Sequence, residues 1–282
     1  MPIQWFPGHM AKAKREVEEK LKLVDFVIEL VDARAPLSSE NPMLHQVLQS
    51  KDKMVVLMKR DLADPKMTES WLNYYKKHDI PAIAIDANDK SDIKRVINLA
   101  KELGQKKVAK LAAKGIKPRA HRAMIIGIPN VGKSTLINRL ANKKAAKTGD
   151  RPGITKQQLW IKIGKDFELL DTPGILWPKF EDQTVGERLA AIGTIKDQVL
   201  SLQDIVVFVI RFMKKHYPAL LEDRFGITQE MDDMYEVFEL IGKRRGALES
   251  GGEVNFDKVS DLFLRDLRTG KLGRVTLEQP EG

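Results

Sequence analysis

A glycine-rich loop, GIPNVGKS at residues 127–134, places the strongest constraint on what this chain can fold into. The loop fits the pattern GxxxxGK[ST], and it lies after an apolar strand-like run and before a helix-like segment, where that pattern has structural meaning. In such a loop the glycines let backbone N–H groups surround the phosphates of a nucleotide. The sequence therefore predicts a nucleoside-triphosphate site on an α/β fold.

The place of this loop along the chain is unusual. A second motif, Lys59-Arg60-Asp61, follows an apolar run and is similar to the base-reading motif NKxD, yet it precedes the phosphate loop instead of following it. The usual GTPase order is the reverse. We therefore expect a circularly permuted P-loop GTPase domain, in which the segment that senses the third phosphate leads directly into the last part of the chain.

Short apolar runs with helix-like segments between them predict the sheet. The expected strands span residues 26–31, 54–58, 80–85, 123–128, 159–163 and 167–170, the last two joined as a hairpin across Gly164 and Lys165. The first three recur at the spacing of a βαβ unit. We predict an α/β fold, a mostly parallel six-stranded sheet with helices on both faces.

Past Pro178 the pattern becomes helical, and we place a domain boundary there. The GTPase domain is expected over residues 1–178, including an N-terminal segment 1–20, and a small all-α domain over residues 179–282. The expected helices of the second domain include 205–213, 231–241 and a segment that begins after the N-cap Asn255 and stops at Gly270. Basic side chains of this domain include the cluster Lys243-Arg244-Arg245 and, opposite the apolar face of the last helix, Arg265 and Arg268.

Composition narrows the partners and the environment. The net charge of +9 favours a polyanionic partner without requiring one. The segment from Lys101 to Arg122, rich in Lys and Arg with the single acid Glu102, is either a solvated helix and linker or a contact for a phosphate backbone. The absence of cysteine excludes disulfides, Cys-ligated zinc and thiol catalysis, and it suits a reducing cytosol. No apolar stretch is long enough to cross a membrane, so we expect a cytoplasmic chain.

The residues that follow two of the expected strands predict how Mg²⁺ and the phosphates are bound. Lys133 is expected to neutralise β- and γ-phosphate oxygens, and the Ser134 hydroxyl to bind Mg²⁺. Asp171, in the string DTPG at residues 171–174, is expected to hold Mg²⁺ directly or through water, with the Gly174 N–H on the γ-phosphate. Thr155 is available as a second hydroxyl ligand while the γ-phosphate is present, which would make its loop a switch.

Base recognition departs from the usual pattern at one position. Asp61 can accept two N–H groups from the guanine edge, which adenine cannot supply, and the stem of Lys59 can pack over the base. Met58 stands where Asn is usual, and the loss of that amide should cost about 1–3 kcal/mol, roughly ten- to a hundredfold in affinity. The Ala87 N–H can bond the guanine O6. The predicted nucleotide-binding residues are Met58, Lys59, Arg60, Asp61, Asp86, Ala87, Asn130, Val131, Gly132, Lys133, Ser134, Thr135 and Gly174.

The residue after DTPG is Ile175, where many GTPases carry a Gln that orients the attacking water. Isoleucine cannot do this, so either hydrolysis is slow until a partner helps, or another group positions the water. Asn130 can help to coordinate K⁺, which offsets charge as an arginine finger does. His9, in the string WFPGHM at residues 5–10, is the other possibility. The candidate catalytic residues are therefore His9, Lys133 and Thr155.

With these motifs assembled, the chain resembles the circularly permuted GTPases, and specifically the bacterial ribosome biogenesis GTPase A family. The strings that carry the resemblance are QWFPGHM at 4–10, DAR at 32–34, KRD at 59–61, residues 127–135 and DTPGILWP at 171–178. The resemblance covers nearly the whole chain, helical tail included. Met58 departs from the family's Asn.

This resemblance implies GTP and GDP as ligands with Mg²⁺ and K⁺, and a role in late assembly of the large (50S) ribosomal subunit. Hydrolysis would be stimulated by that subunit, with His9 taking part, and the C-terminal helical domain would contact rRNA. The implied partner is the large-subunit precursor, through rRNA and ribosomal proteins, with no DNA or membrane partner and a monomeric chain. Two alternatives remain open: an RNA-binding scaffold with a vestigial nucleotide site, and an NTPase with relaxed base preference.

Overall fold

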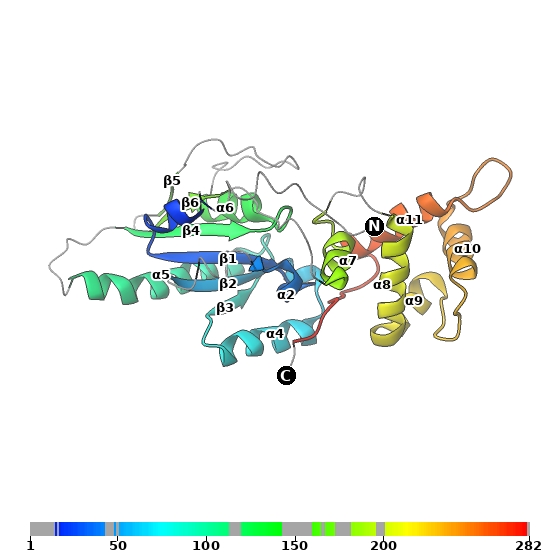
Figure 1. Cartoon of the computed structure of the whole chain (residues 1–282), viewed down its shortest axis with the longest axis horizontal. Helices are drawn as coiled ribbons and strands as arrows, with labels where there is room; N and C mark the ends of the chain where they lie inside the picture. The colour runs from blue at the N-terminus through cyan, green and yellow to red at the C-terminus, as the bar shows by residue number, and fades with distance from the viewer. Residues whose placement is uncertain are drawn as a thin grey trace.

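The structure, a computed structural model, describes residues 15, 17–42, 48, 51–112, 120–142, 160–164, 167–172, 182–195 and 201–280. In this part of the chain a six-stranded sheet has the order β3-β2-β1-β4-β6-β5 (Figure 1). Its strands are β1 (Phe26–Asp32), β2 (Asp52–Met58), β3 (Ala82–Ala84), β4 (His121–Gly127), β5 (Trp160–Ile163) and β6 (Phe167–Asp171). All neighbours pair in parallel except β5 and β6, which are antiparallel, so the predicted mostly parallel sheet and its hairpin are confirmed.

Helices cover both faces of the sheet. The side chains of β1 point alternately to the two faces, so they pack against both layers of helices. Phe26, Ile28 and Leu30 pack in one buried cluster with residues of α5 (Lys90–Ala112) and α6 (Lys133–Ala141). On the opposite face Val31 packs with residues of α4 (Pro65–Lys77), and Val27 packs with the helical residues 17–21. β1 is therefore buried on both faces, which explains its nearly continuous apolar sequence.

The strand order places a crevice at the carboxyl ends of the two central strands, β1 and β4. The chain passes from β1 to β2 and β3 on one side, then returns to β4 on the other side of β1. At such a switch point the loops after the two central strands diverge and leave a space outside their carboxyl ends. The loop after β4 is the glycine-rich loop, so the topology places the phosphate motif at this crevice.

The last part of the chain packs as helices beside this end of the sheet (Figure 1). The helices are α7 (Gln183–Ala191), α8 (Leu202–His216), α9 (Pro218–Phe225), α10 (Met234–Arg245) and α11 (Phe256–Arg268). Asn255 is the N-cap of α11, accepting a hydrogen bond from the Lys258 N–H at 2.8 Å, as predicted. Gly270 follows the helix with a φ of +76°, a conformation that glycine adopts without strain. Within the described ranges no helix combines the length and the apolarity needed to span a bilayer.

After α11 the chain returns to the sheet, along the red trace that ends beside α4 in Figure 1. The backbone N–H of Val275 donates to Leu62 O at 3.2 Å, and that of Leu277 donates to Arg34 O at 2.7 Å. The Glu278 carboxylate accepts the N–H of Ser38, in the short helix α2 (Pro36–Ser39). The expected boundary at residue 178 lies outside the described residues, and the tail 272–278 joins the two expected domains.

Candidate functional site

The glycine-rich loop connects β4 to α6 in the conformation that a phosphate site needs. Gly132 has a φ of +106° and Asn130 a φ of +59°, and α6 begins at the next residue, Lys133. A Cβ on Gly127 would lie 2.9 Å from Val131 Cγ1 and 3.1 Å from Leu30 Cβ. Glycine is thus required at 127 by close packing and at 132 by conformation. The backbone N–H groups of this turn and of the N-terminus of α6 form a site suited to an anion.

The carboxylate of Asp171 lies beside Lys133, at the end of this loop. It ends β6, is buried, and forms an ion pair with the Lys133 ammonium. The neighbouring Thr172 hydroxyl donates to Ile125 O at 2.6 Å, which holds the end of β6 against β4. Ser134 follows Lys133 and is half-buried. A lysine, a hydroxyl and a carboxylate from three separate motif positions therefore meet at one end of α6.

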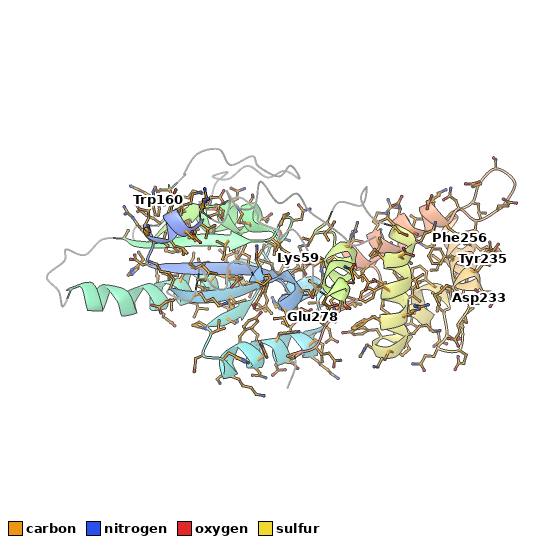
Figure 2. The ribbon with its side chains drawn as sticks, in the orientation of Figure 1. Lys59, Trp160, Asp233, Tyr235, Phe256 and Glu278 are labelled. Carbon is orange, nitrogen blue, oxygen red and sulfur yellow. The ribbon has the colours of Figure 1, made fainter. Side chains whose placement is uncertain are left out.

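The base-reading motif lies at the same crevice. Lys59 Nζ donates to Asn130 O of the phosphate loop at 3.0 Å and to Asp32 Oδ2 at 2.9 Å. Lys59 itself has a left-handed backbone, with a φ of +61° at the end of β2. Figure 2 shows it at the end of the sheet that faces the helical region. A motif before the phosphate loop in sequence is thus in contact with it in space, as the permuted order requires.

Met58, which replaces the usual Asn, is buried and does not face the crevice as a polar group would. It is 1 % exposed, and its Cε lies 3.0 Å from the position that a Cβ on Gly132 would occupy. The thioether therefore supports the phosphate loop by apolar contact, where an amide would have supported it by hydrogen bonds.

The loop after β3 is joined to the loop after β2. Asp92 Oδ2 accepts Arg60 Nη2 at 2.7 Å and the Asp86 N–H at 2.8 Å. Asn88 in turn accepts a hydrogen bond from Arg139 Nη2 of α6 at 2.9 Å. Asp61 is exposed and Ala87 half-exposed beside these contacts. The structure thus places Arg60 as a connector between the two predicted base-contacting loops.

Asp32 and Arg34, to which the sequence motifs assign no role, lie beside Lys59. Arg34 Nε and Nη2 donate to the two oxygens of Asp32 at 2.9 and 2.8 Å, and Lys59 donates to the second oxygen as well. Burial would raise the pKa of Asp32, but the charges and hydrogen bonds of Arg34 and Lys59 outweigh burial and hold this pKa well below its usual value. The sequence signal that identifies Asp32 is its position at the carboxyl end of a buried strand, which Asp171 shares.

The carbonyl groups at the C-terminal end of α7 accept hydrogen bonds from three separate elements. Asn130 Nδ2 donates to Gly193 O at 3.2 Å, and Arg34 Nη2 donates to Ile192 O at 3.2 Å. Arg268 of α11 donates to Ala190 O at 2.7 Å and, through Nε, to Ala191 O at 3.0 Å. Arg268 is therefore held at this junction, whereas Arg265 is exposed. The phosphate loop and the last helix are both bonded to one helix end.

Several predicted site residues lie outside the described residues: His9, Thr155 and Gly174. Ile175 does as well. Of the remaining predicted residues, Met58 to Asp61, Asp86 and Ala87 lie on the loops after β2 and β3, and Asn130 to Thr135 together with Asp171 lie around the start of α6. Asn130 and Lys133 are each bonded to another element of the pocket.

Comparison with known proteins agrees with this arrangement. Residues 122–243 match the family model described as "50S ribosome-binding GTPase". The chain is 58 % identical to the Ribosome biogenesis GTPase A of Bacillus cereus, over 100 % of this chain and 95 % of that protein. It is 33 % identical to the protein of the same name from Thermotoga maritima, over 99 % and 95 %.

Solved structures are similar over the same length. The GNP-bound YlqF of T. maritima matches with a TM-score of 0.71 and 28 % identity, covering 96 % of this chain and 99 % of that one. The GDP-bound form matches with a TM-score of 0.69 and 27 % identity, over 95 % and 100 %. The similarity extends over the sheet and the helices that follow it.

Proposed function

This chain belongs to the ribosome biogenesis GTPase A family, a GTPase family of ribosome assembly, and on that premise we propose that it acts in late maturation of the large (50S) subunit. In this proposal the GTP form docks on rRNA of the subunit precursor and the GDP form leaves after hydrolysis, which the particle stimulates. The chain works as a cytoplasmic monomer, with residues 1–178 as the GTPase domain and 179–282 as the RNA-binding domain. The observation that carries the proposal is the contact of Lys59 with the phosphate loop at Asn130 O.

The phosphate half of the site fits a magnesium-bound triphosphate. A hydroxyl and a carboxylate are the oxygen donors that Mg²⁺ prefers, and Ser134 and Asp171 would hold it, where it offsets the charge of the phosphates. Lys133 now neutralises Asp171. When GTP binds, Lys133 turns to the β- and γ-oxygens and leaves the Asp171 carboxylate to the metal side. Thr155 would supply the second hydroxyl ligand of Mg²⁺ while the γ-phosphate is present, and the Gly174 N–H would contact that phosphate.

The base half of the site fits guanine. The exposed Asp61 carboxylate accepts the two N–H groups of the guanine edge, and Lys59 lies between Asp32 and the phosphate loop, where its stem covers the base. Ala87 lies in the loop after β3, which Asp92 connects to Arg60, and its N–H would bond the guanine O6. Met58 lowers affinity because it supplies no amide to the base.

Hydrolysis needs a group in place of the missing Gln, and Asn130 and His9 are the two residues we assign. Asn130 uses its amide N–H on Gly193 O, which leaves Oδ1 as the atom for K⁺. His9 would orient the attacking water. Hydrolysis that is slower in Na⁺ than in K⁺, and slower still for His9→Ala, is the expected pattern.

Coupling to the helical domain follows from the end of α7. This helix comes soon after the γ-phosphate segment in sequence, and its last carbonyls are bonded by Asn130 on one side and by Arg268 on the other. A change in the loop on hydrolysis can therefore alter the position of α11. A switch of this kind requires that the GTP and GDP forms differ in affinity for the particle.

The test is co-sedimentation with large-subunit precursor particles in the presence of a non-hydrolysable GTP analogue or GDP. We expect binding with the analogue and release with GDP. Arg268→Ala should reduce this difference while intrinsic hydrolysis stays the same, and Arg265→Ala, on the same helix but exposed, serves as the matched control. Equal sedimentation of the unmodified chain with both nucleotides would refute the proposal.

A further inference from the structure

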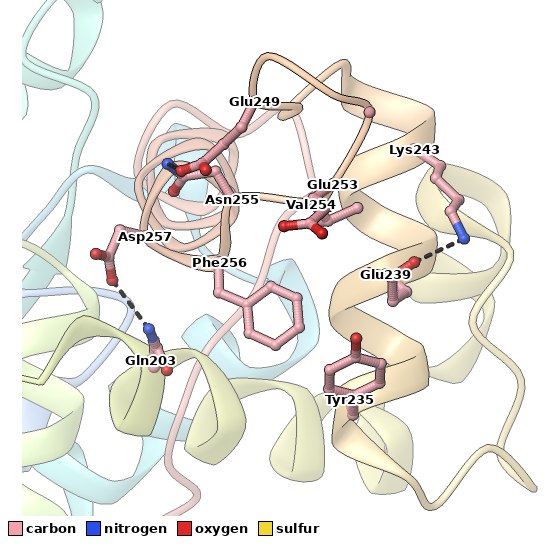
Figure 3. Close-up of a pocket in the computed structure, with 11 residues that line it drawn as sticks. Gln203, Tyr235, Glu239, Lys243, Glu249, Glu253, Val254, Asn255, Phe256 and Asp257 are labelled. Carbon is pink, nitrogen blue, oxygen red and sulfur yellow. Dashed lines mark hydrogen bonds and ion pairs between the residues drawn. The ribbon is translucent and has the colours of Figure 1, made fainter.

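A groove in the helical region is separate from the nucleotide motifs. It has a volume of about 620 Å³ and is formed by the start of α8, one face of α10, the hairpin at Leu248–Val254 and the first turn of α11 (Figure 3). In Figure 2 its residues Tyr235 and Phe256 are labelled at the end of the molecule away from the sheet. The groove therefore has no part in binding GTP.

An aromatic surface lines one side of the groove. Tyr235 is 62 % exposed, and its ring meets that of Phe256 edge to face at 5.2 Å. Phe256 in turn lies 5.2 Å from the ring of the buried Phe238. The Tyr235 ring thus packs on Phe256, which is supported by the core, and the rest of the ring is exposed to solvent. Exposed aromatic rings on a firm support are the side chains that contribute most at protein interfaces.

Acidic side chains form the rim. Glu239 is paired with Lys243 at 2.6 Å, whereas Glu249 and Asp257 accept hydrogen bonds from the neutral amides of Asn255 and Gln203, at 2.7 and 2.9 Å. In the described part of the chain no ion pair compensates Glu249, Glu253 or Asp257. The rim is therefore negative on a chain whose net charge is +9.

The hairpin places the backbones of Glu249 and Glu253 opposite each other. Leu248 and Val254 form an antiparallel bridge, and the Glu249 N–H donates to Glu253 O at 2.8 Å. Gly251 and Gly252, with φ of +118° and +88°, make the tight turn between them. Glu249 and Glu253 thus lie on adjacent strand ends at one edge of the groove.

We propose that this groove docks an extended, Lys- or Arg-bearing segment of a ribosomal protein. The inference rests on the proposed function, because the particle that the chain would bind is made of polyanionic RNA and basic proteins. Phosphates are repelled by the negative rim, whereas lysine or arginine side chains pair with Glu249, Glu253 and Asp257. An arginine can also stack on the open face of Tyr235. The groove therefore selects the protein component of the particle.

A binding titration tests the chemistry of the groove without the particle. The probe is a short fluorescent peptide of Lys, Arg and Leu, compared with a peptide that has Glu in place of the basic residues and with an RNA hairpin. Of these three probes, only the basic peptide should bind in the groove. We expect roughly tenfold weaker binding of it to Glu253→Lys and to Tyr235→Ala, and unchanged binding to Tyr235→Phe and to Glu69→Lys, a charge reversal on the exposed face of α4.

All these variants should keep the intrinsic GTPase rate, because none of the changed residues lies at the nucleotide site. Equal binding of the basic peptide to the unmodified chain and to Glu253→Lys and Tyr235→Ala would overturn the proposal. So would loss of RNA binding, instead of peptide binding, in those two variants.

A photo-crosslink identifies the occupant in the particle. With Tyr235 replaced by a benzoylphenylalanine, irradiation of the complex with large-subunit precursors should give crosslinks to protein. Crosslinks to rRNA, or none in a complex that co-sediments, would overturn the groove proposal alone. Failure of the complex to form at all would instead count against the proposed function, while the peptide titration still decides the chemistry of the groove.

Discussion

Two buried carboxylates, one in the nucleotide pocket and one in the returning tail, behave in opposite ways. Asp32 and Glu278 are 1 % and 4 % exposed, and both residues are bonded to the short helix α2: the backbone N–H of Asp32 donates to the Ser39 hydroxyl, and the carboxylate of Glu278 accepts the Ser38 N–H. Burial raises both pKa values, but the charges and hydrogen bonds of Arg34 and Lys59 outweigh burial at Asp32 and hold its pKa well below the usual value, whereas burial raises the pKa of Glu278 above its ordinary 4.5.

The difference comes from the cations that face each group. Burial acts on both, but Asp32 faces the buried Arg34 in a two-pronged contact and Lys59 as well. Glu278 has the hydroxyl and N–H of Ser38 and a single cation, Arg188 at 3.2 Å, and these do not outweigh burial. Asp32 therefore stays ionised into stronger acid than an ordinary carboxyl group, whereas Glu278 takes up its proton more readily than one.

Removal of the pocket cation nearest the phosphates should have the largest effect. Lys133→Ala should lower GTP hydrolysis by roughly a hundredfold or more. The variant lacks the positive charge that stabilises the negative charge developing on the phosphate oxygens in the transition state. Single-turnover hydrolysis measures it, with Lys66→Ala, an exposed change on α4, as control. A Lys133→Ala protein that hydrolyses GTP at the unmodified rate would mean that the loop is not the phosphate site.

The next effect concerns the base. Asp61→Asn should weaken GTP binding roughly ten- to a hundredfold and improve XTP binding, because the amide matches the carbonyl of xanthine. Competition of ATP, XTP and GTP for a fluorescent GDP analogue measures both. Asp52→Asn, an exposed acid at the other end of β2, should change neither. If Asp61→Asn leaves the order of preference intact, Asp61 does not read the base.

Met58→Asn separates affinity from stability. The amide should raise GTP affinity up to roughly tenfold, while its burial against Gly132 should lower the free energy of unfolding of the nucleotide-free chain by about 1–3 kcal/mol. Met58→Leu, similar in volume, should change affinity little and stability by less than about 1.5 kcal/mol. Titration calorimetry and urea unfolding give the two values. Unchanged GTP affinity in Met58→Asn would show that this position does not reach the base.

The smallest effect is the pH dependence of the tail. A raised folded-state pKa means that the folded chain binds the Glu278 proton more tightly, so this stabilisation is present below 4.5 and is lost as pH rises through the raised value. The contribution of Asp32 has the opposite sign: it is full above 3.8 and lost only in stronger acid. Glu278→Gln should therefore flatten the fall in unfolding free energy as pH rises above 4.5.

Urea unfolding of Glu278→Gln, the unmodified chain and Glu69→Gln across this pH range measures the difference. Glu69 is exposed, so its variant should follow the unmodified chain. A Glu278→Gln curve parallel to that of the unmodified chain would show that Glu278 does not titrate in this window.

The sequence by itself determined the features that depend on near neighbours. The apolar runs of the buried strands, the Asn255 cap and the glycines of the phosphate loop are all readable within a few residues, because apolar runs, capping and tight turns are local. The order of the motifs also predicted the permuted topology, because the base-reading motif at Lys59 precedes the phosphate loop that it must meet at the nucleotide.

Only the tertiary structure decided which partner each charge has. Lys59 meets Asn130 across 71 residues, Arg34 meets Ile192 across 158, and Ser38 meets Glu278 across 240. Arg268, expected opposite the apolar face of its helix, instead bonds the end of α7. Pairing over such separations is set by packing of whole elements, and the energy of a charge depends on what buries it, which no local pattern encodes.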